Sequence, residues 1–162
     1  MGIKAITALS FLLITPLLFA QHSTQSFDRS AFYTAMSANK IEQVNAQVEI
    51  LRNASFARKT AFEGALLMKK AGLVSKTSEK LSLFKEGHKK LDEAISKDIQ
   101  NAELRFLRLM IQENAPKAVK YQGEIENDSS FIKQNYRQMP PEAQKALVDY
   151  SKVSKVLTPS DF

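Results

Sequence analysis

The stretch from Ser78 to Ile111 constrains the fold of this chain more than any other, because it shows the clearest helical periodicity. Its first part carries a stripe at steps of three and four residues, formed by Leu81, Phe84, His88, Leu91 and Ile95. This spacing predicts one amphipathic helix with a single buried face. The pattern breaks at 98–101, and the next segment, 102–111, is apolar on most sides. A helix of that kind is usually central, so we expect other helices to cover this pair.

Helical spacing is also found along the rest of the chain. Segments with one apolar face lie near residues 29–39, 40–53, 55–72, 116–127, 130–139 and 142–157. No segment alternates apolar and polar residues convincingly, as a half-buried strand would. We therefore predict an all-α single domain over residues 28–158, followed by a short tail at 159–162. Short connections imply about seven or eight antiparallel helices, arranged as a bundle or as a stack of helical hairpins.

Several residues have the types and positions of helix caps. Asp28 and Asn101 precede predicted helices and are expected to cap them through their side chains. Asp128 or Ser129 is expected to do the same for the segment 130–139. Gly72, which follows a pair of lysines, is expected to end its helix in a left-handed conformation.

Residues 1–20 have the pattern of a cleavable secretory signal. Lys4 is followed by an uncharged apolar run to Ala20, and a polar lead-in, 21–27, comes next. The apolar run is short for a membrane span and contains Pro16, which disfavours an uncleaved anchor. The sequence has no cysteine, so it lacks the residue that carries the lipid of a bacterial lipoprotein. We expect an exported protein, periplasmic or secreted, that is not a lipoprotein.

Composition narrows the classes of partner and cofactor. Without cysteine the chain has no disulfide bonds and no zinc site with thiolate ligands. The formal net charge of +6 favours weak contact with anionic surfaces, such as lipid headgroups or acidic glycans, although such a charge also serves solubility alone. The lysines are dispersed, with no aromatic residues interleaved as a stacking platform, so we expect no nucleic-acid partner.

Residues 87–109 resemble the junction between two tetratricopeptide repeats. The matching positions are Gly87, Leu91, Ala94, Asp98, Asn101, Ala102 and Glu103. The sequence departs from the family at Ile99, where Pro is usual, and at Arg105 and Arg108, where the family has apolar residues; no second copy of the pattern follows at a period of about 34 residues. The resemblance implies a stack of helical hairpins that binds a protein or peptide in a groove. The alternative is a plain helical bundle with a similar helix–turn–helix.

Polar residues on the apolar helices are the candidate site residues. His88 lies on the stripe with Asp92 one turn later, which suits a general base oriented by a carboxylate or a hydrogen-bonded structural histidine. Arg105 and Arg108 lie one turn apart on the most apolar segment. They suit a clamp for an anion or a carboxylate, or an ion-pair network that fixes helix register.

Two tyrosines complete the candidate site. An exposed groove is expected near the arginine pair, lined by Tyr121 and Tyr136 as further ligand-binding residues. If the arginines are structural instead, Glu63 is a candidate partner for them, because it lies on another strongly apolar helix.

These patterns predict an exported, non-catalytic helical protein that binds another protein or a peptide in the cell envelope. The alternatives are a binder of anionic lipid or glycan that acts through surface lysines, and a small hydrolase that uses His88. The sequence holds no glycine-rich phosphate loop, nucleophile elbow, zincin motif or calcium loop. We expect no cofactor and no metal.

Overall fold

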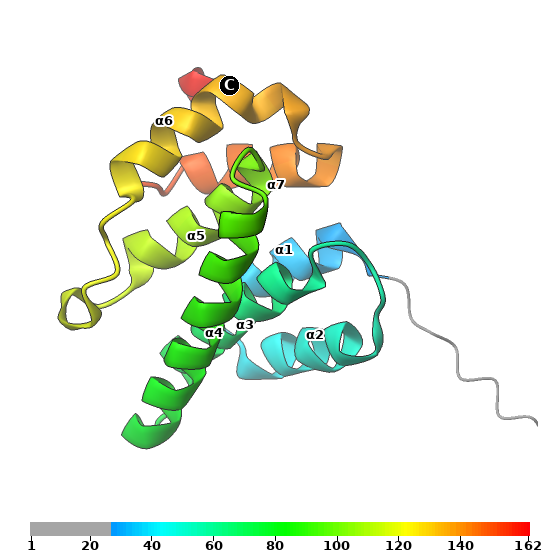
Figure 1. Cartoon of the computed structure of the whole chain (residues 1–162), viewed down its shortest axis with the longest axis vertical. Helices are drawn as coiled ribbons and strands as arrows, with labels where there is room; N and C mark the ends of the chain where they lie inside the picture. Colours follow the sequence, from blue (N-terminus) through cyan, green and yellow to red (C-terminus); the bar gives the residue numbers. More distant parts are fainter. Residues whose placement is uncertain (1–26) are drawn as a thin grey trace, which may run out of the picture.

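The computed structural model describes residues 27–162, and these residues form an all-α single domain (Figure 1). Seven α-helices and three short 3-10 helices follow one another in this part of the chain. Their bounds are α1 Arg29–Ser37, α2 Ile41–Asn53, α3 Lys59–Leu73, α4 Thr77–Lys97, α5 Ala102–Asn114, η1 Lys117–Val119, α6 Ile125–Asn135, η2 Tyr136–Gln138, α7 Pro141–Ser151 and η3 Pro159–Asp161. The predicted fold class is confirmed.

The hairpin of α3 and α4 is the tightest contact in the fold. A Cβ atom added to Gly64 would lie 2.7 Å from the carbonyl oxygen of Gly87, and one added to Gly87 would lie 2.5 Å from the carbonyl oxygen of Gly64. The two backbones therefore touch where both residues lack a side chain, as close helix packing at small residues requires. This contact joins α3 to the second half of α4.

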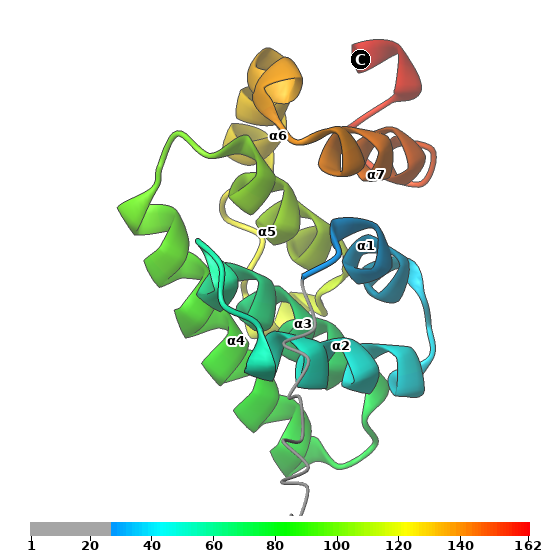
Figure 2. The same ribbon diagram turned by 90° about the vertical axis from the view of Figure 1, so that its right-hand side faces the viewer.

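Helix α5 lies at the centre, as its apolar sequence predicts (Figure 2). It packs against α3, α4 and α6, and Phe106 contacts both Tyr33 of α1 and Tyr150 of α7. The side chains that are fully enclosed by these helices include Phe32, Phe62, Phe106, Leu51, Leu66, Leu91, Leu104, Leu107, Leu109, Ile132, Leu147 and Leu157.

The turn between α4 and α5 has the predicted capping residues. The side chain of Asn101 accepts a hydrogen bond from the backbone N–H of Leu104 at 3.2 Å, and donates one to Asp98 at 3.0 Å. Arg58, which precedes α3 in a left-handed conformation with φ of 68°, also binds the Asp98 carboxylate. Asp28 caps α1 by accepting from the backbone N–H of Ala31 at 3.1 Å. The described helices show no repeated hairpin unit, and the resemblance of residues 87–109 to a tetratricopeptide junction stays a prediction.

Three local predictions about the extent of helices are wrong. Gly72 continues α3 to Leu73 and is not in a left-handed conformation. The segment 116–127 is not one helix, because Lys120 takes a left-handed conformation with φ of 50° after η1. The last predicted helix ends at Ser151, because the chain beyond it turns to bind Glu113 of α5: the backbone N–H of Lys155 donates to that carboxylate at 2.6 Å.

The packed part of the chain extends past both predicted limits of the domain. Phe27 stacks on Phe56 with ring centroids 4.1 Å apart, and Phe162 packs against Tyr136 at 4.9 Å. The predicted secretory signal, 1–20, and most of the predicted lead-in lie outside the described residues, so both stay predictions.

Candidate functional site

Helix α5 directs Arg105 and Arg108 toward α6, where both meet Asp128. Arg108 donates two hydrogen bonds to this carboxylate, from Nε to Oδ2 at 2.7 Å and from Nη2 to Oδ1 at 2.8 Å. Arg105 donates a third from Nη1 at 3.2 Å. Asp128 is fully buried, and its ion pairs with these two guanidinium groups offset the cost of removing the charges from water.

Each arginine has further contacts that fix its position. Arg105 donates from Nε and Nη2 to the carbonyl oxygen of Ile99, at 3.1 and 2.9 Å, and its guanidinium lies 4.2 Å from the ring centroid of Phe131. Burial alone would lower the pKa of Arg108, but the hydrogen bonds and charge of Asp128 outweigh burial and raise it. Internal contacts therefore account for both side chains. Glu63, the partner suggested by the sequence, binds Lys90 at 3.1 Å and Lys59 at 3.4 Å instead.

A second cluster of polar side chains joins α4 to Tyr121, two residues after η1. His88 Nε2 lies 2.9 Å from Oδ2 of Asp92, and the hydroxyl of Tyr121 donates to Oδ1 of the same carboxylate at 2.9 Å. The rings of His88 and Tyr121 meet edge to face, with centroids 4.5 Å apart. Burial, followed by the charge of Asp92, raises the pKa of Tyr121 well above its ordinary value. The imidazole is half-exposed and the phenol buried.

Four of the five predicted ligand-binding residues thus lie in one region. After burial and Asp128, the charge of Asp92 and the phenol of Tyr121 also act on the pKa of Arg108 and help to raise it, which links the two polar groups electrostatically. Tyr136 lies elsewhere, at the end of α6, against the C-terminal Phe162. The prediction that these residues bind a ligand stays a prediction.

Asp128 is the site residue that sequence reasoning misread, since it was expected to be a helix cap. Helix α6 begins at Ile125, so Asp128 lies inside its first turn and faces the core. A signal was present, because Asp128 is spaced three residues after Ile125 and four before Ile132, on the stripe that α6 buries.

The first turns of α4 carry the same stripe as the rest of the helix but are not covered. Leu81 is 50% exposed and Phe84 is only partly buried, whereas Leu91 is fully enclosed. In both views this part of α4 forms one end of the described chain (Figure 1 and Figure 2). The connection that holds η1 lies beside it, because Tyr121 contacts Phe84 edge to face at 5.6 Å. Val119 of η1 is 38% exposed.

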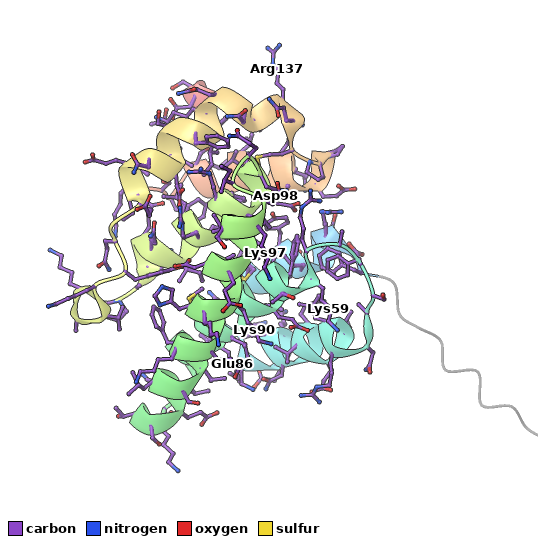
Figure 3. All side chains as sticks on the ribbon, viewed as in Figure 1. Lys59, Glu86, Lys90, Lys97, Asp98 and Arg137 are labelled. Atoms are coloured by element: carbon purple, nitrogen blue, oxygen red, sulfur yellow. The ribbon has the colours of Figure 1, made fainter. Side chains whose placement is uncertain are left out.

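Lysines surround these exposed apolar residues. We call the combined area the tip surface and define it as Leu81, Phe84, Lys85, Lys117, Val119 and Lys120. No carboxylate of the described residues lies within 4.0 Å of its three lysines. Further along α4 the pattern is different: Lys90 binds Glu86, which is labelled beside it in Figure 3, and Glu63 of α3. The tip surface therefore combines exposed apolar side chains with lysines that form no ion pair among the described residues.

Other features add little chemistry to the described residues. In that part of the chain no group of three or more His, Cys, Asp or Glu side chains is placed to hold a metal ion. A hollow of about 500 Å³ lies at the start of α6 and is lined by Gln122, Gly123, Ile125, Glu126, Asn127 and Val156. None of the helices between residues 27 and 162 is both long and apolar enough to cross a membrane.

Comparisons with known protein families, with curated protein sequences and with solved structures find no match for this chain. The class defined by the fold is a small all-α domain.

Proposed function

We propose that this chain is a non-catalytic binding protein of the cell envelope that acts through the tip surface. The proposal is supported by a difference in burial along the apolar stripe of α4. The later positions of this stripe, Leu91 and Ile95, are buried, whereas Leu81 is half-exposed. A large apolar side chain at helical spacing that the described chain leaves half-exposed is available to a partner.

The arginine pair is less suited to be the binding surface. Arg105 and Arg108 share the carboxylate of Asp128, so a ligand would have to displace an internal, buried ion pair. The tip surface has no such competitor among the described residues, since its lysines are unpaired. The contact surface that we propose is therefore the tip surface on α4 and η1, and not the predicted groove beside the arginine pair of α5.

Catalysis by His88 has weaker support. The imidazole has a carboxylate partner in Asp92, as a general base would, but its other close neighbour is the ring of Tyr121. In the described part of the chain no serine or threonine hydroxyl is hydrogen-bonded to it. We propose that His88 holds the connection after η1 against α4, which keeps the two parts of the tip surface together.

Site-specific photo-crosslinking in the native cell tests the proposal. A photoreactive residue replaces Leu81 in one variant and Lys145 in the other; Lys145 is an exposed, unpaired residue of α7. We expect an adduct at position 81, to a protein or to a lipid, that is not formed from position 145. The same adducts from both positions, or none from position 81, would contradict the proposed function.

A further inference from the structure

We propose that the tip surface docks on an anionic phospholipid surface, with Leu81 and Val119 entering the interface and the surrounding lysines meeting the headgroups. This inference rests on the proposed function and names the partner of the same surface. Three observations support it. Leu81 and Val119 are exposed, the first turns of α4 form one end of the described chain, and the lysines of the tip surface form no ion pair among the described residues.

The apolar part of the surface has the geometry of a shallow anchor. Leu81 and Val119 come from different elements, α4 and η1, and each is exposed to more than a third. Phe84 follows Leu81 by three residues and Tyr121 follows Val119 by two, and these two rings meet edge to face. Tyr121 is held in turn by its hydrogen bond to Asp92. The exposed side chains therefore stand on a supported base, and their burial in a lipid interface needs no rearrangement of the fold.

The charge around the anchor is complementary to anionic headgroups. Lys85 lies one turn after Leu81 on the same side of α4, and Lys117 and Lys120 flank Val119 in η1 and just after it. Two more exposed lysines without an ion pair, Lys76 and Lys80, lie at the start of the helix. Long lysine side chains can follow an apolar surface inward while the ammonium group stays with the phosphates. Each lysine near such a surface strengthens binding severalfold.

Acidic residues do not cancel this charge. Glu79 is the acidic residue in the first turn of α4, where a carboxylate favours the helix dipole. Glu86 binds Lys90, toward α3, and Glu93 lies 3.9 Å from Lys89. The area around Leu81 and Val119 therefore keeps an excess of positive charge.

The shape and composition favour lipid over a protein partner. A stable protein interface covers roughly 800 Å² on each side and is centred on aromatic residues and arginine, while lysine is depleted there. The first turns of α4 lie at one end of the described chain (Figure 2), and lysines flank both exposed aliphatic residues, Leu81 and Val119. Such a surface fits a plane of headgroups better than it fits the groove or pocket of a second protein.

Binding to vesicles tests the inference. The purified protein is mixed with vesicles in which about a third of the lipid is phosphatidylglycerol, the rest being phosphatidylcholine, and with vesicles of phosphatidylcholine alone. Every variant keeps the same N-terminal segment as the unchanged protein, so a difference in binding between variants does not come from that segment. We expect binding to the anionic vesicles, weaker or no binding to the neutral ones, and a steep loss as salt is raised from about 0.05 to about 0.5 M.

Two triple variants of equal charge separate the tip surface from net charge. Replacing Lys85, Lys117 and Lys120 by Gln should weaken partitioning to anionic vesicles by roughly a hundredfold. Replacing Lys40, Lys97 and Lys145 by Gln, which are exposed and unpaired at other places, should weaken it by less than about threefold. Leu81→Ser should weaken partitioning about tenfold and leave its salt dependence unchanged. All the changed positions are exposed, and the helical circular dichroism of each variant confirms its fold.

The outcomes are distinct. Equal losses in the two triple variants, or equal binding to neutral vesicles, would overturn the inference. If vesicles are not bound but position 81 crosslinks to a protein in the cell, the partner is a protein, so the inference fails and the proposed function stands. If neither vesicles nor a crosslinked partner depends on position 81, both fail.

Discussion

The two halves of α4 have the same sequence pattern and different surroundings. In the base of α4, residues 87–97, the stripe is buried and the helix backbone touches α3 at Gly87. In the tip of α4, residues 77–86, the same stripe is exposed at Leu81 and surrounded by unpaired lysines. Periodicity predicts that a segment is helical and which face is apolar, but it does not predict what covers that face.

The same substitution, Leu to Ala, made once in each half of α4 is the strongest test of this difference in burial. Leu91→Ala removes a fully enclosed side chain and leaves a cavity, which should lower the free energy of unfolding by about 3 kcal/mol. Leu81→Ala removes a half-exposed one and should change it by no more than about 0.5 kcal/mol. Urea denaturation of the two variants measures both values. Similar losses would mean that the tip of α4 is covered in the folded protein and that the two halves do not differ.

The two polar groups allow the same comparison for charge. Asp128→Asn removes the buried carboxylate bound to Arg108 and should cost about 3 kcal/mol of stability, since the remaining counterion, Glu124, is half-exposed and 3.8 Å away. Asp92→Asn acts on a carboxylate whose side chain is 38% exposed, and the new amide oxygen can still accept from Tyr121, so we expect less than about 1 kcal/mol.

Thermal and urea unfolding of both asparagine variants, at one pH and one salt concentration, provide the check. A larger loss for Asp92→Asn than for Asp128→Asn would place the structural ion pair near the tip and not in the core. It would also weaken the case for the tip surface as the binding surface.

Much of the frame could be predicted from the sequence because local rules determine it. The all-α class, the central position of α5, the break after α4 and the side-chain caps at Asp28 and Asn101 all follow from spacing and capping chemistry. These features depend on residues within a few positions of one another, so one sequence is enough to read them.

The features that could not be predicted depend on contacts between distant segments. Asp128 looked like a cap because its type suits one, and only the packing of α6 on α5 makes it the partner of the arginines. Likewise, the segment after α7 leaves the helix because it binds Glu113, more than forty positions earlier. For the candidate site, the sequence singled out His88, Arg105, Arg108 and Tyr121. It offered Asp92 as the partner of His88 and an ion-pair network for the arginines, but it did not indicate that Asp128 is their shared partner.

Glycine substitutions test how closely the backbones of α3 and α4 are held together. Gly87→Ala places a Cβ against the carbonyl oxygen of Gly64, so the base of α4 must move away from α3, at a cost of about 2 kcal/mol. Gly72→Ala meets nothing within 4 Å, and alanine favours helix, so it should gain about 0.5 kcal/mol. Opposite signs of the change in urea midpoint are the expected result. A neutral Gly87→Ala variant would mean that the two helices are not held at this distance.

The smallest effect concerns Tyr121, which lies where the tip and the base of α4 meet. Burial and the nearby Asp92 raise the pKa of this phenol in the folded state, whereas in the unfolded chain it titrates near about 10. The stability that this difference provides is complete below that pH and is lost as the pH rises above it, because the unfolded state then releases a proton that the folded state retains. By a pH of about 10.5 the loss should reach about 1 kcal/mol. Tyr121→Phe should flatten the decline of urea stability above pH ~9.5 relative to the unchanged protein. An identical slope in both proteins would show that the phenol reaches water in the folded state. Tyr121 would then be part of the exposed tip surface and not of the buried contact with Phe84 that supports this surface.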